Sequence, residues 1–370
     1  MTADVKLQPI PLGPLPSYPA ISILMSVYNY GHYVGAAIES VLRQSYPRFE
    51  CIICDDGSTD DSVKVVERYL GDPRLRLFQK TNGGQATALN MGFAKLQGDI
   101  VCLLDADDLY ASTKLERIVN IMQRNPRSGC VLNASRIVDH ELRPLGALPL
   151  FGRFPSGWCG PKLLAAAGLL PYMPGTPGMN VRREVAEAIF PLPAEPPLNG
   201  FADMLLWRLI PLFSVIEVTY EHLAFIRRHE TNTYQRSRIT KETIQRELDI
   251  TIQLWLEQGR RAAQIDPAIG ALLAPLDTSS IVLLEQYMHA RLTRYAGEHV
   301  YHKRLLALLR AQGYGLGYRA FWRAAPYIPS CRFESVINLL FTHNKWKASL
   351  SHFVYAVGRA RYPLRNVGTM

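Results

Sequence analysis

Short apolar, β-branched runs alternate with stretches of helical spacing over the first hundred residues. Four such runs predict buried strands, at 21–27, 49–54, 75–79 and 100–104. Between them, apolar residues recur every three or four positions and predict helices at 33–45, 62–70 and 86–96. This alternation requires parallel strands joined by right-handed crossovers. We therefore expect an α/β fold with a Rossmann-like, mostly parallel sheet and binding sites at the carboxyl ends of its strands.

The alternating pattern loosens after about residue 129. Further strands are expected at 130–134 and 214–218, and a helix at 203–212. Residues 240–312 carry nearly continuous helical spacing. The chain is thus expected to comprise a Pro-rich leader (1–19), an α/β domain (20–238) and a helical, basic C-terminal region (239–370).

Positive charge is concentrated at the C-terminal end. The chain of 370 residues has a formal net charge of +9, yet residues 301–370 alone contain eleven Lys and Arg against one acid, Glu334. This distribution argues against nucleic acid as a partner and confines any attraction to polyanions or membranes to the C-terminal segment. The aromatic residues mixed into this segment fit either peripheral contact with anionic lipid or a helical bundle with a solvated basic face.

The cysteines and the N-terminal segment indicate the cellular compartment of the protein. Cys51 and Cys54 have the spacing of a zinc knuckle, but no second pair follows at ligand distance. Buried thiols of a reducing compartment are the simpler interpretation. The N-terminus, with five prolines in residues 1–19, is not expected to be a signal peptide, and no stretch of the sequence approaches the roughly 20 apolar residues that span a bilayer. We expect a cytoplasmic protein, at most peripheral to the inner face of the membrane.

Three carboxylates, Asp105, Asp107 and Asp108, directly follow the strand at 100–104. Because they repel one another and offer no packing benefit, they indicate a cation. Alternate side chains of a strand share a face, so Asp105 and Asp107 are expected to meet one ligand, while Asp108 turns away or joins them. Oxygen ligands of this kind suit Mg²⁺ or Mn²⁺. The alternative is a solvated acidic loop that caps the next helix.

A second acidic cluster, at 55–60, follows another predicted strand and should face the same crevice. Asp55 and Asp56 could accept hydrogen bonds from a base imide or from ribose hydroxyls. Ser58, Thr59 and Asp60 could instead serve only as an N-cap for the next helix, which would leave the first two acids free.

The order of these motifs is similar to that of glycosyltransferase family 2. The matching segments are 23–29, 52–60, 82–84 with 90–92, and 104–108. The resemblance is dense over residues 20–125 and thinner to about 235. It implies an inverting, metal-dependent transferase of the A-type fold, with residues 20–238 as the nucleotide-sugar-binding catalytic domain.

The resemblance also assigns roles to individual residues. Asp56 resembles the acid that meets the base, Asp105 the acid at the ribose or sugar, and Asp107 or Asp108 the acid that holds metal against the diphosphate. The implied donor-binding residues are Val27, Tyr28, Asn29, Asp55, Asp56, Gly84, Asp105 and Ala106. The implied metal-binding residues are Asp107, Asp108 and His229, where the histidine could equally contact phosphate or be structural.

A catalytic base is implied at Asp203. The segment 200–208 resembles the one in which such enzymes place an acid before a helix, although Ala202 stands where many relatives have a second acid. An apolar neighbourhood would raise the pKa of Asp203 toward that of a useful base. Without the resemblance, a helix N-cap is the favoured interpretation of Asp203, and only the resemblance shifts the balance to catalysis.

The sequence thus predicts a glycosyltransferase of the hexosyltransferase type, with a nucleotide diphosphate-sugar donor and a glycan, lipid-linked or protein acceptor. A nucleotidyltransferase of similar fold normally has a Gly-rich, basic loop after its first strand, where this chain has Tyr28-Asn29-Tyr30-Gly31. A non-catalytic carbohydrate-binding derivative is the third alternative, and intact acids at both strand ends argue against it.

Overall fold

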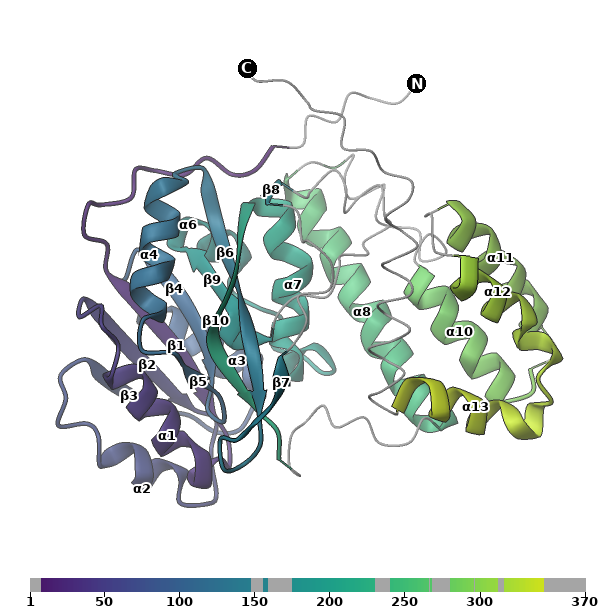
Figure 1. Cartoon of the computed structure of the whole chain (residues 1–370), viewed down its shortest axis with the longest axis horizontal. Helices are drawn as coiled ribbons and strands as arrows, with labels where there is room; N and C mark the ends of the chain where they lie inside the picture. Colours follow the sequence, from purple (N-terminus) through teal and green to yellow (C-terminus); the bar gives the residue numbers. More distant parts are fainter. Residues whose placement is uncertain are drawn as a thin grey trace.

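A computed structural model describes most of the chain. The described residues are 8–147, 156–158, 175–229, 240–265, 267, 280–295, 297–311 and 316–342. A central sheet flanked by helices forms one part of the molecule, and a group of C-terminal helices forms the other, with a long helix between them (Figure 1). The predicted leader lies partly outside these residues, and so do residues 343–370.

The sheet is mixed and mostly parallel, as predicted. Its main path runs β3-β2-β1-β4-β9-β6-β10-β5. Neighbours β1–β2, β1–β4, β2–β3 and β6–β10 are parallel, whereas β9 is antiparallel to both β4 and β6. The strands are β1 (Ile21–Val27), β2 (Phe49–Asp55), β3 (Leu75–Gln79), β4 (Ile100–Asp105), β5 (Leu109–Tyr110), β6 (Ser128–Val138), β7 (Pro144–Ala147), β8 (Gly157–Trp158), β9 (Met179–Arg182) and β10 (Val215–Arg227).

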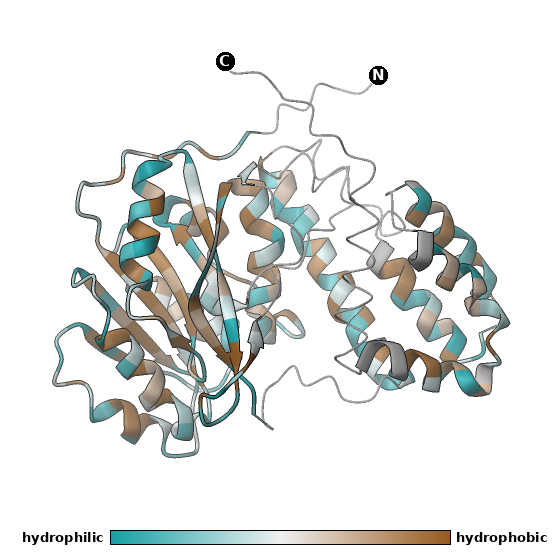
Figure 2. Cartoon of the chain, viewed as in Figure 1, coloured by the Kyte–Doolittle hydropathy of each residue, from teal (hydrophilic) through white to brown (hydrophobic). Residues whose placement is uncertain are grey.

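Helices cover both faces of the sheet, and this explains the continuous apolar runs of its central strands. One apolar core packs under α1 (Gly31–Leu42) and α4 (Lys114–Arg124). The other packs under α3 (Gln85–Phe93), α6 (Arg183–Ile189) and α7 (Ala202–Phe213). Alternate residues of β1 enter opposite cores, as Ile23 and Leu24 show. Figure 2 shows the apolar strands enclosed between these layers.

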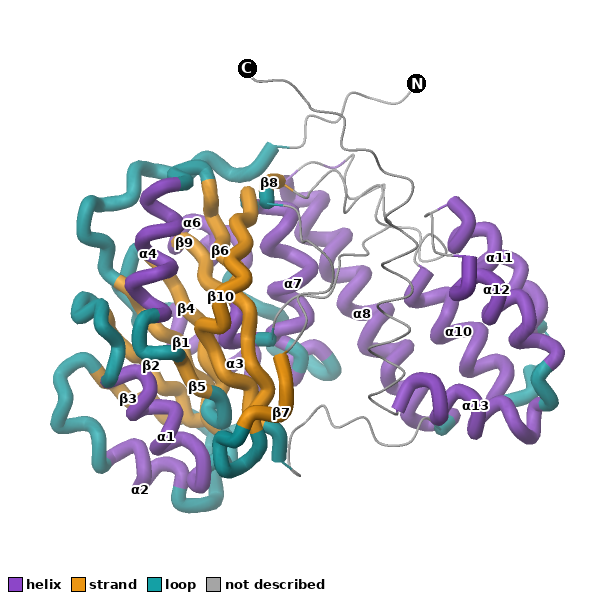
Figure 3. The backbone as a smooth tube through the Cα atoms, viewed as in Figure 1, coloured by secondary structure: helices purple, strands orange, loops and turns teal. Residues whose placement is uncertain are grey.

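The C-terminal region is helical in its described part, as predicted. Its helices are α8 (Lys241–Ile265), α10 (Ser280–Leu292), α11 (Glu298–Ala311), α12 (Leu316–Ala324) and α13 (Ser330–Thr342) (Figure 3). Leu254 and Trp255 of α8 pack into the core beside the sheet, while Ile244 of the same helix packs into a separate core with α10–α13. The α8 helix therefore ties the two parts together. Within the described residues, no helix combines the length and the apolarity needed to cross a membrane.

Two strand predictions were too short. The segment expected at 130–134 lies within β6, and the segment expected at 214–218 belongs to β10 from Val215 onward; the two strands have 11 and 13 residues. The exposed middle of β10, around Tyr220, interrupts the apolar pattern, and a register shift against β6 accompanies it. Backbone pairing, which carries no apolar signature, therefore extends both strands beyond their apolar runs.

The cysteines agree with the thiol interpretation. Cys51, Cys54, Cys102 and Cys130 are free and buried. Burial raises the pKa of the Cys54 thiol to about 12. Since metal binding requires the thiolate, this environment disfavours a zinc site at the pair Cys51 and Cys54. Cys159 lies outside the described residues.

Candidate active site

Both acidic clusters lie at the same edge of the sheet. Strand β1 is parallel to β2 and to β4, and its last residues, Ser26 and Val27, pair with Asp105 and Asp55 respectively. The two acidic strand ends are therefore separated by a single strand, a spacing of roughly 10 Å. This shared edge follows directly from the parallel register.

A glycine loop connects the two clusters. The amide N–H groups of Gly83 and Gly84 donate to the two carboxylate oxygens of Asp56 at 3.0 and 2.7 Å, and the next side chain, Gln85, donates to Asp105 at 3.1 Å. Gly84 has φ +92, and a Cβ there would lie 2.8 Å from a backbone oxygen of Asn199. Only glycine suits this position. Gly84, a predicted donor-binding residue, is therefore required for the loop that connects Asp56 to Asp105.

Asn29 joins the loop after β1 to the loop after β2. Its Oδ1 accepts from the amide of Thr59 at 2.8 Å, and its own amide donates to Ser58 at 3.0 Å. Its backbone has φ +57, a conformation that asparagine tolerates better than most residues. Asp55 accepts from the amide of Ser58 at 3.0 Å, while the Tyr28 ring is 45% exposed. The segment 58–60 thus joins two loops rather than serving only as a helix cap.

The carboxylates of Asp105, Asp107 and Asp108 converge. One ligand oxygen from each lies within 4.8 Å of the others. Burial, followed by the neighbouring carboxylates, raises the pKa values of Asp105 and Asp108. Asp107 and Asp108 are buried, and the N-cap residue of the helix after them is a different one, Thr113. The alternative of a solvated acidic loop capping that helix is therefore wrong.

This carboxylate group suits a divalent cation. Three hard oxygen donors at short mutual distance form the ligand set that Mg²⁺ and Mn²⁺ prefer. Burial first, and the repulsion between the carboxylates second, raise the pKa values of Asp105 and Asp108, and a bound cation would stabilise their charged forms. The residues present fit the metal that the sequence predicts.

His229 reaches the acids through the end of β10. Strand β5 directly follows the acids in the chain, and it pairs with β10 so that Leu109 lies opposite Phe225. This pairing brings the C-terminal end of β10, and with it His229, close to the acids. The Nε2 atom of His229 lies 3.0 Å from Asp107 Oδ2, and its ring stacks on Tyr33 at 4.3 Å. The ligand atoms that lie within 4.8 Å of one another come from Asp105, Asp107 and Asp108, and this group does not include His229. A role for His229 as a metal ligand stays a prediction, whereas its contact with Asp107 is a feature of the structure.

Asp203 lies in the first turn of α7, whose N-cap is Phe201, and is close enough to the acidic edge to interact with it electrostatically. The preceding turn is tied to the glycine loop because Asn199 Nδ2 donates to the Gly83 carbonyl at 3.0 Å. The charge of Asp203 contributes to the raised pKa of Asp105. Burial raises the pKa of Asp203 itself to about 6, and the amide of Met204, which donates at 2.7 Å, opposes that shift.

Several residues of this site escaped the sequence analysis. Gln85 and Thr176 hydrogen-bond to Asp105, and the Arg227 amide donates to Asp108 at 2.9 Å. Asn90, part of a quoted motif without an assigned role, exchanges two hydrogen bonds with the backbone of Leu192. None has a local pattern that would mark it, because each acts through a partner far away in the chain.

Two predicted donor-binding residues are buried behind the edge. Val27 is 1% exposed and accepts the Asp56 amide through its backbone oxygen at 2.8 Å. Ala106 is also 1% exposed and packs into the core with α1 and α4. With so little exposed surface, neither side chain offers a large contact to a ligand. The donor contacts predicted for them would be made mainly by the backbone.

Comparison with known proteins agrees with this architecture. Residues 22–158 match the family model of Glycosyl transferase family 2. An uncharacterized glycosyltransferase of Nostoc sp. is 34% identical over 226 residues, which are 58% of this chain and 66% of that protein. The alignment therefore spans just under two thirds of that relative's own length.

Two solved structures share the fold. The S. aureus TarS 1-349 complex with UDP-GlcNAc has a TM-score of 0.54 at 16% identity, over 86% of this chain and 90% of that chain. The mannosyltransferase PcManGT from Pyrobaculum calidifontis, in complex with GDP-Man and Mn²⁺, has a TM-score of 0.51 at 18% identity, over 95% and 89%. At these identities the likeness concerns the fold.

The mostly parallel sheet with an acidic edge is that of an A-type glycosyltransferase domain. Residues 22–158, which form most of that domain, match glycosyltransferase family 2.

Proposed function

We propose that this protein is an inverting, metal-dependent glycosyltransferase that moves a sugar from a nucleotide diphosphate-sugar to an acceptor hydroxyl. The observation that carries the proposal is the convergence of Asp105, Asp107 and Asp108 within 4.8 Å at a strand end. Asp203 adds a carboxylate that can act as a base, and its charge contributes to the raised pKa of Asp105. The family match and the nucleotide-sugar complexes of the fold relatives support the donor class.

The donor would lie along the edge formed by the ends of β1, β2 and β4. Tyr28 and Asn29 would border the nucleoside, with Asp56 toward the base and Asp55 holding the loop in shape through Ser58. The glycine loop at Gly84 would approach the donor closely. Asp105, already bonded to Gln85, would receive the hydroxyls of the ribose or sugar.

Transfer would proceed by a single displacement. Asp203 accepts the proton of the acceptor hydroxyl while that oxygen forms a bond to the anomeric carbon. The bond from this carbon to the diphosphate oxygen breaks, and the nucleoside diphosphate leaves with the electron pair. Attack from the face opposite the leaving group inverts the anomeric centre. A pKa of about 6 leaves Asp203 mostly ionised at neutral pH, so it is ready to act as a base.

The metal would be held by Asp107 and Asp108, with His229 as a further ligand or as the group that orients Asp107. A bound Mg²⁺ or Mn²⁺ neutralises charge on the departing diphosphate. The stacking of His229 on Tyr33 and its hydrogen bond to Asp107 fix the imidazole, so this chain holds one metal-binding carboxylate in a set orientation.

The acceptor and the location are also proposals. A glycan, lipid-linked or protein hydroxyl would serve as acceptor, and the protein would act in the cytoplasm, where its four buried free thiols persist. Peripheral contact with the inner face of the membrane would be made through the basic C-terminal region, which carries eleven basic residues after residue 300.

The substitution Asp203→Asn tests the mechanism. The variant should bind the donor as well as the wild type but transfer sugar about 10²- to 10⁴-fold more slowly, because the base is lost while the donor edge is intact. Asp249→Asn, at an exposed position on α8, is the matched control and should be fully active. Full transfer by the Asp203 variant would remove this residue from the mechanism.

Product analysis separates the proposal from its rival. Thermal-shift measurements with UDP, GDP, dTDP and CMP, with and without Mn²⁺, select the donor class, since the nucleotide that binds stabilises the fold. With the matching sugar nucleotide, release of a nucleoside diphosphate and an inverted anomeric configuration are expected. Release of pyrophosphate from a nucleoside triphosphate and a sugar phosphate would identify a nucleotidyltransferase instead.

A further inference from the structure

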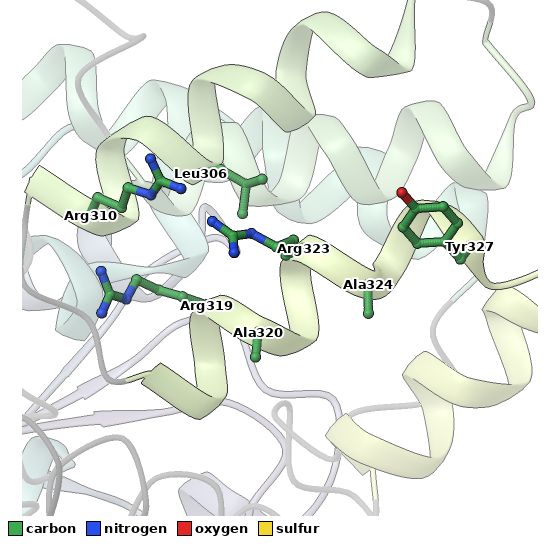
Figure 4. Close-up of a pocket in the computed structure, with 7 residues that line it drawn as sticks. All are labelled: Leu306, Arg310, Arg319, Ala320, Arg323, Ala324 and Tyr327. Atoms are coloured by element: carbon green, nitrogen blue, oxygen red, sulfur yellow. The ribbon is translucent and has the colours of Figure 1, made fainter.

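A pocket between α11 and α12 gathers three arginines. It has a volume of about 610 Å³, within the range of small-molecule sites. Arg310 projects from α11, and Arg319 and Arg323 project from α12, so that their guanidinium groups face one another across the gap between the helices (Figure 4). Leu306 and two alanines, Ala320 and Ala324, form its short apolar wall, and Tyr327, 87% exposed, stands at its rim.

This arrangement has no stabilising explanation within the described structure. Arg319 and Arg323 are four residues apart on one helix, a spacing at which like charges repel. None of the ion pairs among the described residues involves the three arginines, and Arg319 Nε is buried without a hydrogen-bond partner there. After residue 300 the sequence supplies a single acid, Glu334. Among the described residues, no carboxylate therefore balances the charge of these three arginines.

The donor geometry selects the kind of anion. Each guanidinium presents a planar fork that matches two oxygens of a phosphate or a carboxylate. One or two forks satisfy a carboxylate, whereas three forks converging from two helices suit the several oxygens and double charge of a phosphate or diphosphate group. The alanines leave room above the helix surface for such a group.

We propose that the pocket formed by Arg310, Arg319 and Arg323 is a binding site for a phosphate or diphosphate group, separate from the donor edge of the sheet. The group belongs either to a soluble phosphorylated compound or to the headgroup of a lipid. The site does not depend on sugar transfer, and its test measures binding alone.

Calorimetric titration with inorganic pyrophosphate in EDTA tests the site. Without metal, the carboxylates of the donor edge repel this anion. Arg323→Gln and Arg310→Gln, both at exposed positions, should each weaken binding about tenfold or more, as expected for loss of a charge-assisted hydrogen bond. The triple variant should not bind. Arg304→Gln, an exposed position on α11 outside the pocket, makes the same charge change and should leave the affinity within about twofold.

A second arm identifies the source of the phosphate. Vesicles of phosphatidylcholine, with or without phosphatidic acid, are mixed with each variant and floated. Binding of pyrophosphate but not of vesicles assigns a soluble ligand, and loss of phosphatidic-acid binding in the pocket variants alone assigns a lipid headgroup. Equal losses in Arg304→Gln and the pocket variants, or no binding of either probe, would overturn the proposal.

Discussion

Replacement of Lys114 by methionine tests how a buried amine supports the acidic edge. Lys114 is 0% exposed, and its Nζ donates to Asn133 Oδ1 at 2.5 Å and to the Pro177 carbonyl at 2.9 Å. Pro177 lies in the 3₁₀ turn Thr176–Gly178, and Thr176 hydrogen-bonds to Asp105. Lys114 therefore anchors the turn that contacts the first acid.

The environment of Lys114 favours the neutral amine. A neutral amine has two N–H donors, and the two acceptors match them, whereas burial penalises the charged form. Burial lowers the pKa of Lys114 from 10.5 to about 7. At about 1.4 kcal/mol per pKa unit, the charged form is disfavoured in the folded protein by roughly 5 kcal/mol.

The pH dependence follows from linkage. Above pH 7 the folded protein releases this proton while the unfolded chain keeps it up to pH 10.5, so the unfolded state binds more protons and stability rises with pH. Between pH 7 and pH 8.5 this contribution amounts to about 1–2 kcal/mol. Methionine has no proton to release, so the stability deficit of Lys114→Met should grow by that amount over this range.

Urea unfolding at several pH values between 7 and 8.5 measures the difference between wild type and variant, in which the titration of all other groups cancels. Lys64→Met is the matched control because Lys64 is exposed and pairs with Asp61 on the surface. Its deficit should be independent of pH in this range. A Lys114→Met deficit equally independent of pH would show that the buried nitrogen keeps its proton, and would refute the reasoning.

Three further outcomes are expected. The kcat/KM of transfer should rise tenfold per pH unit below about 6 and level off above it, because Asp203 acts as an ionised base; a flat profile down to pH 5 would exclude this. Excess Mn²⁺ should raise the Tm of the wild type but not of Asp107→Asn, and an equal rise in both would place the metal elsewhere. Gly92→Ala should destabilise the fold by about 1–3 kcal/mol, because its Cβ would lie 2.5 Å from Cys54 Sγ; Gly71→Ala, with open space around its Cβ, should not, and urea unfolding compares the two.

Strand β9 shows where sequence analysis fell short. Its four residues, Met179–Arg182, insert antiparallel between β4 and β6. The strand is too short to show an alternating pattern, and its direction depends on partners about 50 and 80 residues away. The first four strands were predicted nearly to the residue because burial on both faces makes each of them continuously apolar.

Candidate site residues divide in the same way. Asp105, Asp107 and Asp108 are adjacent in the chain, and a strand end is enough to bring them together. The contact of His229 with Asp107 spans 122 positions and depends on the pairing of β10 with β5. No local pattern distinguishes that histidine from a structural one.

The sequence by itself determined the alternating fold, the parallel direction of the first strands and the position of the acids at their carboxyl ends. Buried strands and the helices that connect them each have a local hydrophobic pattern, which is why these features could be predicted. Only the tertiary structure decided how those acids are supported. The glycine loop between Asp56 and Asp105, the buried amine of Lys114 and the arginines facing one another across α11 and α12 all arise from contacts between distant segments. Such contacts depend on packing geometry, which the composition of each segment leaves open.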